Sequence, residues 1–311
     1  MYIGIDVGGT NIAAALVTPQ WHIVKKTSRP TLPGRGAGAV IDDLRDIIRE
    51  MSAGLADGVQ AIGIGVPGVV DNKAGYVFRT PNMPLDGTPL VRMLGQDVPV
   101  YLGNDANVAA LGEYRMGAAR GVNSMVMVTL GTGVGGGFIM DGRIVEGVGG
   151  AAAEIGHIVV CRNGLPCTCG RRGCWEKYAS ASALIRMTEE AMQAHPESLL
   201  KQAMTGDPPH VSGRTAFDAA RQGDGVAQSV LDEYIDWLAE GALNVIIMLQ
   251  PEVLCVGGGV SGEGDALLVP LKQRIEARQY CPGIRQTEVK KAILGNDAGL
   301  IGAALLADHA V

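Results

Sequence analysis

Two stretches of the chain repeat one pattern, in which a strand leads through a glycine-rich turn into a second strand. Residues 2–17 follow this pattern, with Gly8 and Gly9 in the turn. Residues 124–145 repeat it, with the turn at 131–136 and a hairpin behind it. Self-similarity of a supersecondary unit indicates structurally related halves. The sequence therefore predicts an α/β protein with two related lobes.

Apolar periodicity predicts the remaining elements. Val40, Leu44 and Ile47 recur at helical spacing within 39–54, and Asn104 supplies cap chemistry for a helix over 104–116. Further strands are predicted at 21–28, 61–68, 99–102, 253–256 and 287–293, and further helices at 181–194, 213–222, 225–249, 266–278 and 298–308.

A third glycine turn, at Gly257–Gly259, also follows a predicted strand. Glycine allows backbone N–H groups to converge on an anion, because no Cβ stands in the way. Three such turns, together with the repeat, indicate a nucleotide bound in a cleft between lobes. A dinucleotide site is disfavoured: a strand follows the turn at 131–136, and no acid ends the strand after Gly257–Gly259. The phosphate-binding loop of the G-x-x-x-x-G-K-[ST] type is absent from the sequence.

One short segment holds His157, Cys167, Cys169 and Cys174, spaced as H-x9-C-x-C-x4-C. A Cys3His set is a closed, tetrahedral, structural type of zinc site. The surrounding glycines and Pro166 suit a tight turn around a metal better than a core strand or helix. Cys161 is a rival to His157 for the fourth position, because the two side chains would share a face if 156–161 were a strand.

Two aspartates are candidates for phosphoryl-transfer chemistry. Asp105 follows a buried strand and opens a helix, so its carboxylate would either accept a proton from a substrate hydroxyl or cap the helix. Asp6 ends the first strand beside a glycine turn, which suits orienting a hydrated Mg²⁺, although an Asp often serves only to form the turn. Asn104, Glu154, His157 and Glu176 are polar groups able to hold the hydroxyls of a sugar.

Composition excludes several classes. The chain has 311 residues, is 47% hydrophobic and carries a formal net charge of −6 without a basic block, which argues against nucleic-acid binding. No apolar run approaches the length that spans a membrane, and the N-terminus has the character of a strand rather than a signal peptide. Six cysteines, four of them within 161–174, fit a reduced cytoplasm with a metal site better than a disulfide framework.

Taken together, the motifs resemble those of the ROK family of repressors, open reading frames and sugar kinases. They run along essentially the whole chain: I-D-V-G-G-T-N (5–11), G-V-P-G (65–68), T-P-N (80–82), G-N-D-A-N (103–107), L-G-T-G-V-G-G-G (130–137), E-I-G-H (154–157), C-T-C-G-R-R-G-C-W-E (167–176) and G-G-G-V (257–260). The combination of E-x-G-H with C-x-C-G-x-x-G-C is highly specific. The glucokinase branch of the family is the most similar.

The resemblance implies a two-lobed, actin-like ATPase fold of the ribonuclease H type, with a small zinc-binding knuckle at 157–174. It implies a small lobe over 1–117 and 297–311 and a large lobe over 118–296. It also implies a homodimer or homotetramer in the cytoplasm.

The resemblance further assigns roles to individual residues. Asp105 would be the general base on the 6-hydroxyl of the sugar, and His157 would serve both zinc and sugar, which makes it the preferred fourth ligand over Cys161. The sugar contacts would be Gly68, Asn82, Asn104, Glu154, His157 and Glu176. The phosphates of ATP and its Mg²⁺ would lie at Asp6, Gly8, Gly9, Thr10, Gly131, Thr132 and Gly133, and the adenosine near Gly258 and Gly259.

The function implied is ATP-dependent phosphorylation of a hexose, glucose before the alternatives N-acetylmannosamine, fructose and allose. A sugar-responsive repressor is disfavoured, because the first strand begins at Tyr2 and leaves no room for a helix-turn-helix. A catalytically silent sugar-binding protein is disfavoured by the presence of Asp105 and the phosphate turns.

Overall fold

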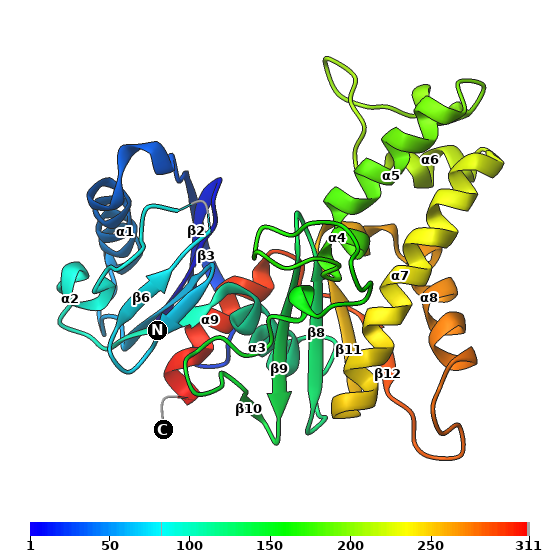
Figure 1. Ribbon diagram of the computed structural model, residues 1–311. Helices are drawn as coiled ribbons and strands as arrows, with labels where there is room; N and C mark the ends of the chain where they lie inside the picture. The colour runs from blue at the N-terminus through cyan, green and yellow to red at the C-terminus, as the bar shows by residue number, and fades with distance from the viewer. Residues whose placement is uncertain (82, 310–311) are drawn as a thin grey trace. The chain divides into compact units, whose positions relative to one another are not determined.

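The computed structural model describes residues 1–81 and 83–309 (Figure 1). The chain divides into two compact units, one formed by 1–125, 137–153 and 293–311, the other by 126–136 and 154–292. The lobe boundaries that the resemblance implied, 1–117 with 297–311 and 118–296, remain a prediction. Among the described residues, no helix combines the length and the apolar character needed to cross a bilayer.

The first unit is built on a five-stranded sheet in the order β3-β2-β1-β4-β7. β1, β2 and β3 form antiparallel pairs, whereas β1, β4 and β7 run parallel. The bounds are Tyr2–Val7 for β1, Asn11–Val17 for β2, Ile23–Pro30 for β3, Ala61–Val66 for β4 and Val100–Asn104 for β7. The predicted strand, glycine turn and strand over 2–17 are confirmed.

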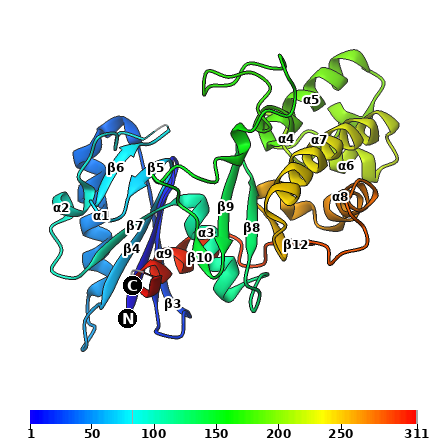
Figure 2. The same cartoon turned by 60° about the horizontal axis from the view of Figure 1, so that its bottom comes forward.

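Helices cover both faces of this sheet (Figure 2). α1 (Ala37–Ser52) buries the apolar stripe predicted from its periodicity, and its residues share one core with Ile3 and Ile5 of β1. Successive strand residues face opposite sides, so Gly4, between those isoleucines, faces the other helix, α9 (Asp297–His309). A Cβ on Gly4 would lie 1.9 Å from the carbonyl oxygen of Leu300. Glycine on the strands therefore lets the backbone of α9 touch the sheet.

α9 also packs against α3 (Asp105–Met116), in the same unit. The contact is again backbone to backbone: a Cβ on Gly302 would lie 1.6 Å from the carbonyl oxygen of Val108, and one on Gly112 would lie 2.3 Å from that of Ala298. This fixes the start of α3, which carries Asp105. Three short elements of this unit had no counterpart in the sequence predictions: β5 (Val69–Asp71), β6 (Tyr76–Arg79) and α2 (Leu90–Leu94).

The second five-stranded sheet has the order β10-β9-β8-β11-β12. Its bounds are Met125–Leu130 for β8, Val134–Met140 for β9, Arg143–Ile144 for β10, Val253–Gly257 for β11 and Glu288–Lys291 for β12. This order matches that of the first sheet position by position. In each sheet the two strands of the strand–turn–strand unit are adjacent, β1 with β2 and β8 with β9. The next strand in sequence lies on one side of this pair, and two later strands lie on the other side. The repeat seen in the sequence is thus a repeat of topology, and the two-sheet α/β fold is confirmed.

Five helices belong to the second unit: α4 (Glu176–Ala179), α5 (Ala181–Ala194), α6 (Thr215–Arg221), α7 (Gly225–Leu249) and α8 (Asp265–Ala277). α7 lies beside α4, α5, α6 and α8 (Figure 1). Its Gly241 admits the ring of the fully buried Trp175, and the Nε1 of Trp175 donates to the carbonyl oxygen of Trp237 at 2.9 Å. This anchor holds the chain directly after Cys174.

Candidate active site and metal centre

The side chains of Asn104 and Asp105 stand where β7 passes into α3. The Oδ1 of Asn104 accepts from the backbone N–H groups of Ala106 at 2.9 Å and Asn107 at 3.1 Å, so Asn104 is the helix cap. Its Nδ2 donates to the carbonyl oxygen of Gly68 at 2.9 Å. Because Asn104 fills the capping role, the hypothesis that Asp105 caps the helix loses its main support. The Asp105 carboxylate accepts from the N–H of Ala106 at 2.9 Å and is also hydrogen-bonded by its own N–H and by the side chain of Asn104.

Asp6 lies at the same edge of the sheet as Asp105. The parallel register pairs Asp6 with Gly65 on β4, and Val66 with Asn104 on β7, so the carboxyl ends of all three strands meet there. The Asp6 side chain also lies against α9, where a Cβ on Gly299 would approach its Oδ2 to 2.9 Å. Gly65 stands in the G-V-P-G motif (65–68), whereas Gly299 belongs to none of the motifs identified in the sequence. An isolated glycine inside a helix pattern is the signal that could have pointed to Gly299.

Both carboxyl groups hold their protons more tightly than usual. Burial and the nearby charge of Asp105 raise the pKa of Asp6 from 3.8 to about 6. Burial also raises the pKa of Asp105, against the hydrogen bonds it accepts. A carboxylate with a raised pKa is a stronger base, which is the property that general-base chemistry near neutral pH requires.

The turn between β1 and β2 presents exposed backbone beside Asp6. Gly9 and Thr10 are exposed, and a Cβ on Gly9 would meet no atom within 4 Å. Thr31 ties the turn to the end of β3, since its Oγ1 donates to the carbonyl oxygen of Gly8 at 2.6 Å and its N–H donates to that of Thr10 at 2.8 Å. The turn is thus anchored from one side and open on the other, as an anion site would be.

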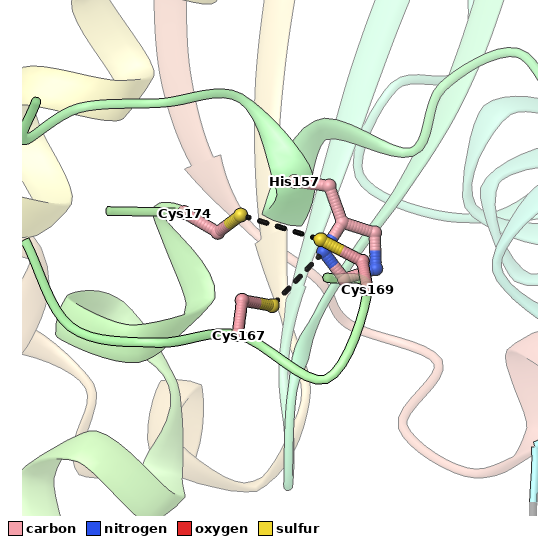
Figure 3. Close-up of side chains that lie close together, drawn as sticks. All are labelled: His157, Cys167, Cys169 and Cys174. Carbon is pink, nitrogen blue, oxygen red and sulfur yellow. Dashed lines mark hydrogen bonds between the residues drawn. The ribbon is translucent and has the colours of Figure 1, made fainter. Parts of the chain in front are cut away.

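In the second unit, His157, Cys167, Cys169 and Cys174 converge (Figure 3). Their ligand atoms all lie within 4.8 Å of one another. The Sγ of Cys167 lies 3.6 Å from the Nδ1 of His157, and the Sγ atoms of Cys169 and Cys174 are 3.6 Å apart. A tetrahedral zinc with metal–ligand distances of about 2.0–2.3 Å has edges of roughly 3.5–3.8 Å. The four residues therefore fit a structural zinc ion.

Local backbone structure explains how this segment turns so tightly. Gly173 has a φ of +77°, and a Cβ there would lie 1.7 Å from the carbonyl oxygen of Cys161. The carbonyl oxygen of Gly173 in turn accepts from Val160 at 2.9 Å, and that of Arg171 accepts from Cys167 at 2.9 Å. These contacts bring Cys174 back beside Cys167 and leave no room for a larger residue at Gly173.

Cys161 lies apart from the four clustered residues. The condition that made it a rival, a strand over 156–161, is not met: residues Ile155–His157 form a single 3₁₀ turn, η2. The Cys161 thiol instead neighbours the hydroxyl of Tyr178, whose pKa is raised by burial and by this thiol. The Tyr178 hydroxyl also accepts from the N–H of Leu165 at 2.7 Å. Tyr178 is a residue of this region that sequence reasoning missed, since a tyrosine in a helix carries no local signal.

The thiols of the cluster differ in their ionisation. Burial raises the pKa of Cys167. Burial, together with the hydrogen bonds that the Cys174 thiol donates to the neighbouring sulfur atoms, raises the pKa of Cys174 to about 12, whereas a backbone hydrogen bond from Arg171 lowers that of Cys169. Cysteine binds metal as the thiolate, so metal uptake here displaces protons.

Two further residues predicted to hold a sugar, Glu176 and Glu154, belong to the same unit as the cluster. The Oε1 of Glu176 lies 3.2 Å from the Sγ of Cys167 and 3.8 Å from the Nδ1 of His157. Glu154 is exposed and precedes η2, with its carbonyl oxygen accepting from the N–H of His157 at 3.0 Å. Gly156 packs so closely on β9 that a Cβ would lie 2.1 Å from the carbonyl oxygen of Val134. The glycine of the E-I-G-H motif is thus a packing requirement.

The other two glycine turns also lie in the second unit. In the turn after β8, the N–H of Gly131 donates to the carbonyl oxygen of Gly133 at 3.0 Å, Thr132 is exposed, and a Cβ on Gly133 would lie 2.7 Å from the Oε2 of Glu176. After β11, Gly258 and Gly259 are exposed. Asn82, the remaining predicted sugar contact, lies outside the described residues.

Comparison with known proteins gives a consistent result. The chain is 39% identical over 308 residues to a protein named glucokinase from Halalkalibacterium halodurans, covering 97% of this chain and 93% of the relative. It is likewise 39% identical over 307 residues to a glucokinase from Thermotoga maritima, with 97% and 95% covered. Among solved structures, a ROK family glucokinase from Streptomyces griseus, crystallised with glucose and AMPPNP, matches with a TM-score of 0.84 and 38% identity over 99% of both chains. The ROK family model matches residues 2–310, and the chain belongs to the ROK family.

Proposed function

We propose that this protein is an ATP-dependent hexokinase that phosphorylates a hexose at its 6-hydroxyl, with glucose as the hexose. One observation carries the proposal: the likeness to the Streptomyces griseus glucokinase, solved with glucose and AMPPNP, extends over 99% of both chains. The site geometry supports it, because a carboxylate with a raised pKa stands at the start of α3, next to a second one at the same sheet edge.

Asp105 is the proposed general base. The 6-hydroxyl oxygen of the sugar attacks the terminal phosphorus of ATP, the bond from that phosphorus to the bridging oxygen breaks, and Asp105 takes the hydroxyl proton. The capping of α3 by Asn104 supports this role, because Asp105 is not needed as the helix cap. Phosphoryl transfer otherwise depends on positioning and charge stabilisation.

The other predicted residues complete the proposal. The sugar hydroxyls are held by Gly68, Asn82, Asn104, Glu154, His157 and Glu176. The phosphates of ATP are held by Gly8, Gly9, Thr10, Gly131, Thr132 and Gly133, the adenosine lies at Gly258 and Gly259, and Asp6 orients the hydrated Mg²⁺. Bound magnesium supplies charge neutralisation for the phosphates.

The Cys3His cluster is proposed to hold a structural zinc ion through His157, Cys167, Cys169 and Cys174. The Nδ1 of His157 is the nitrogen that faces Cys167, which leaves Nε2 available for a sugar hydroxyl. A zinc ion bound to Nδ1 would thus fix the ring that meets the substrate. We also propose that the protein is cytoplasmic, because ATP and reduced thiols are both available in that compartment. A homodimer or homotetramer is the proposed assembly.

The direct test is a coupled assay of ATP consumption with glucose, N-acetylmannosamine, fructose and allose as acceptors. Glucose should give the highest kcat/KM, and the product should carry its phosphate on the 6-oxygen. A higher kcat/KM for another of these hexoses would replace glucose as the substrate. Absence of sugar-dependent ATP consumption, in a protein that still binds glucose, would identify a silent sugar-binding protein.

A further inference from the structure

The turn after β11 carries a buried carboxylate that no role assigned so far uses. This turn is η4 (Gly259–Glu263), and its last residue, Glu263, has a side chain only 5% exposed. Its Oε2 pairs with the guanidinium of Arg221, and its Oε1 lies 3.5 Å from the Nε of Arg214. A buried carboxylate is retained only when such partners compensate for its lost hydration.

The two arginines stand at the two ends of α6, on one face of the helix. Arg214 is the residue before the first helical residue and Arg221 is the last, seven positions on, which is two helical turns. Arg221 also pairs with Asp218 of its own helix at 2.7 Å. The side chains from the two ends of α6 therefore converge on Glu263, which fastens η4 to this helix. We call Glu263, Arg214 and Arg221 the clasp.

The segment that the clasp holds is rich in glycine, whose backbone has the greatest conformational freedom. Gly257, Gly258, Gly259, Gly262 and Gly264 follow one another within eight residues. Close packing and hydrogen bonds restrain its start. A Cβ on Gly258 would lie 2.5 Å from the backbone of Leu130, and the carbonyl oxygen of Gly258 accepts from the Ser261 hydroxyl at 2.7 Å and from the Ser261 N–H at 3.1 Å. Glu263 restrains its end. Between these points the backbone of Gly258 and Gly259 is exposed.

A glycine-rich turn that must order itself around a ligand loses affinity, because each residue fixed costs about 1–2 kcal/mol of conformational entropy. A turn fastened in advance avoids that cost. We propose that Glu263 is a positioning residue for the nucleotide: the clasp holds η4 in the conformation that receives the adenosine half of ATP. This inference rests on the proposed placement of adenosine at Gly258 and Gly259.

If the clasp positions the adenosine site, its loss should weaken the binding of ligands that contain adenosine and leave other ligands unaffected. A contact that only stabilises the fold would not make this distinction. Glu263→Gln keeps the shape of the side chain but removes its charge, so η4 should loosen while the sugar and phosphate contacts stay as they are. The KM for ATP and the inhibition constant of ADP should rise about 3- to 10-fold. The kcat at saturating ATP, the KM for glucose and the inhibition constant of inorganic tripolyphosphate, which has no adenosine, should stay within twofold of wild type.

Arg221 supplies the matched pair of variants. Arg221→Gln should reproduce the effect of Glu263→Gln, and the double variant should be no worse than either single one, because both remove the same interaction. Asp218→Asn removes the other partner of Arg221, the one on its own helix, and should leave the ADP inhibition constant unchanged. An equal effect of Asp218→Asn would show that α6 itself matters and would overturn the role of the clasp.

A further variant separates this inference from the function on which it rests. Gly259 is exposed and a Cβ there would meet no protein atom within 4 Å, so Gly259→Val adds bulk at an open position, beside the proposed adenosine. If Gly259→Val weakens ADP binding and Glu263→Gln does not, the clasp is overturned and the nucleotide placement stands. If neither weakens it, the placement of adenosine fails and the inference falls with it.

Discussion

The carboxyl groups of Asp6 and Asp105 interact at the edge of the first sheet. Burial of Asp6 and the negative charge of Asp105 together raise the pKa of Asp6 from 3.8 to about 6. Asp6 lies near the end of β1, and Asp105 directly follows β7 as the first residue of α3; the parallel register of the strands aligns these ends. Removing the charge of Asp105 should therefore lower the pKa of Asp6.

The raised pKa of Asp6 makes stability depend on pH. In the unfolded chain Asp6 ionises near 3.8, whereas in the folded protein it stays protonated to about pH 6. The folded state thus binds more protons than the unfolded state between these two pH values. The contribution of Asp6 to the free energy of unfolding is therefore greatest below pH 4 and falls as the pH rises to 6. Since each pKa unit is worth about 1.4 kcal/mol, the loss should reach up to about 3 kcal/mol.

Asp6→Asn should abolish this loss. In urea unfolding with a chelator present, the free energy of unfolding of Asp6→Asn, relative to wild type, should be larger at pH 7.5 than at pH 4.5. The exposed Asp57→Asn is the control, with the same chemical change. A difference between Asp6→Asn and wild type that is the same at both pH values would contradict the coupling.

Asp105→Asn should be folded and inactive. Asparagine keeps the shape of the side chain but cannot accept the hydroxyl proton, and removal of a general base costs on the order of 10²–10⁴ in rate. The melting temperature and zinc content should be nearly unchanged, because Asp105 lies outside the Cys/His cluster. The activity of the wild type should decline at acid pH through a pKa above the usual 3.8. A folded variant that retains more than about a tenth of wild-type turnover would remove Asp105 from its role.

Zinc should copurify at about one ion per chain. Cys169→Ser should lose the metal and lower the melting temperature, since structural zinc contributes directly to folding free energy. Cys161→Ser is the matched control, because its thiol neighbours Tyr178 and lies outside the cluster. Metal analysis after gel filtration decides between the ligand sets. Loss of zinc from Cys161→Ser, with retention in His157→Ala, would reverse the assignment of the fourth ligand.

Close packing of α9 should make Gly302 intolerant of a methyl group. Gly302→Ala places a Cβ 1.6 Å from the carbonyl oxygen of Val108, and both atoms belong to helices that have little room to shift. The expected loss is about 3 kcal/mol or more in the free energy of unfolding. Gly38 is an exposed residue of α1 at which a Cβ would meet no atom within 4 Å, so Gly38→Ala should stabilise by up to about 1 kcal/mol. Similar melting temperatures for the two variants would refute the packing argument.

Sedimentation should give a mass of two or four times the 32.3 kDa of one chain. Near its C-terminal end, α7 exposes Ile247 and Met248, at 61% and 62%. If this helix supplies the interface, Ile247→Glu should weaken the assembly through the cost of burying a charge. A single 32.3 kDa species for the wild type at micromolar concentration would contradict the expected oligomer.

Features encoded locally were predicted from the sequence. The strand–turn–strand units, the stripe of α1 and the four residues of the Cys/His cluster depend on neighbours within a few positions, where periodicity, glycine and ligand spacing carry the information. The short elements β5, β6 and α2 were missed because so few residues establish no period.

Tertiary structure alone decided which distant groups meet. Asp6 and Asp105 are far apart in the sequence, and their proximity follows from the parallel register of β1, β4 and β7. The same holds for the fully buried Glu113, which accepts from Ala118 at 2.9 Å and from Leu294, far along the chain, at 2.7 Å. Glu263 with its two arginines is a further case. A buried carboxylate requires partners that compensate for its lost hydration, and these partners can come from any part of the chain that packs nearby. The sequence therefore shows which groups are able to pair, but only the folded chain determines which of them do.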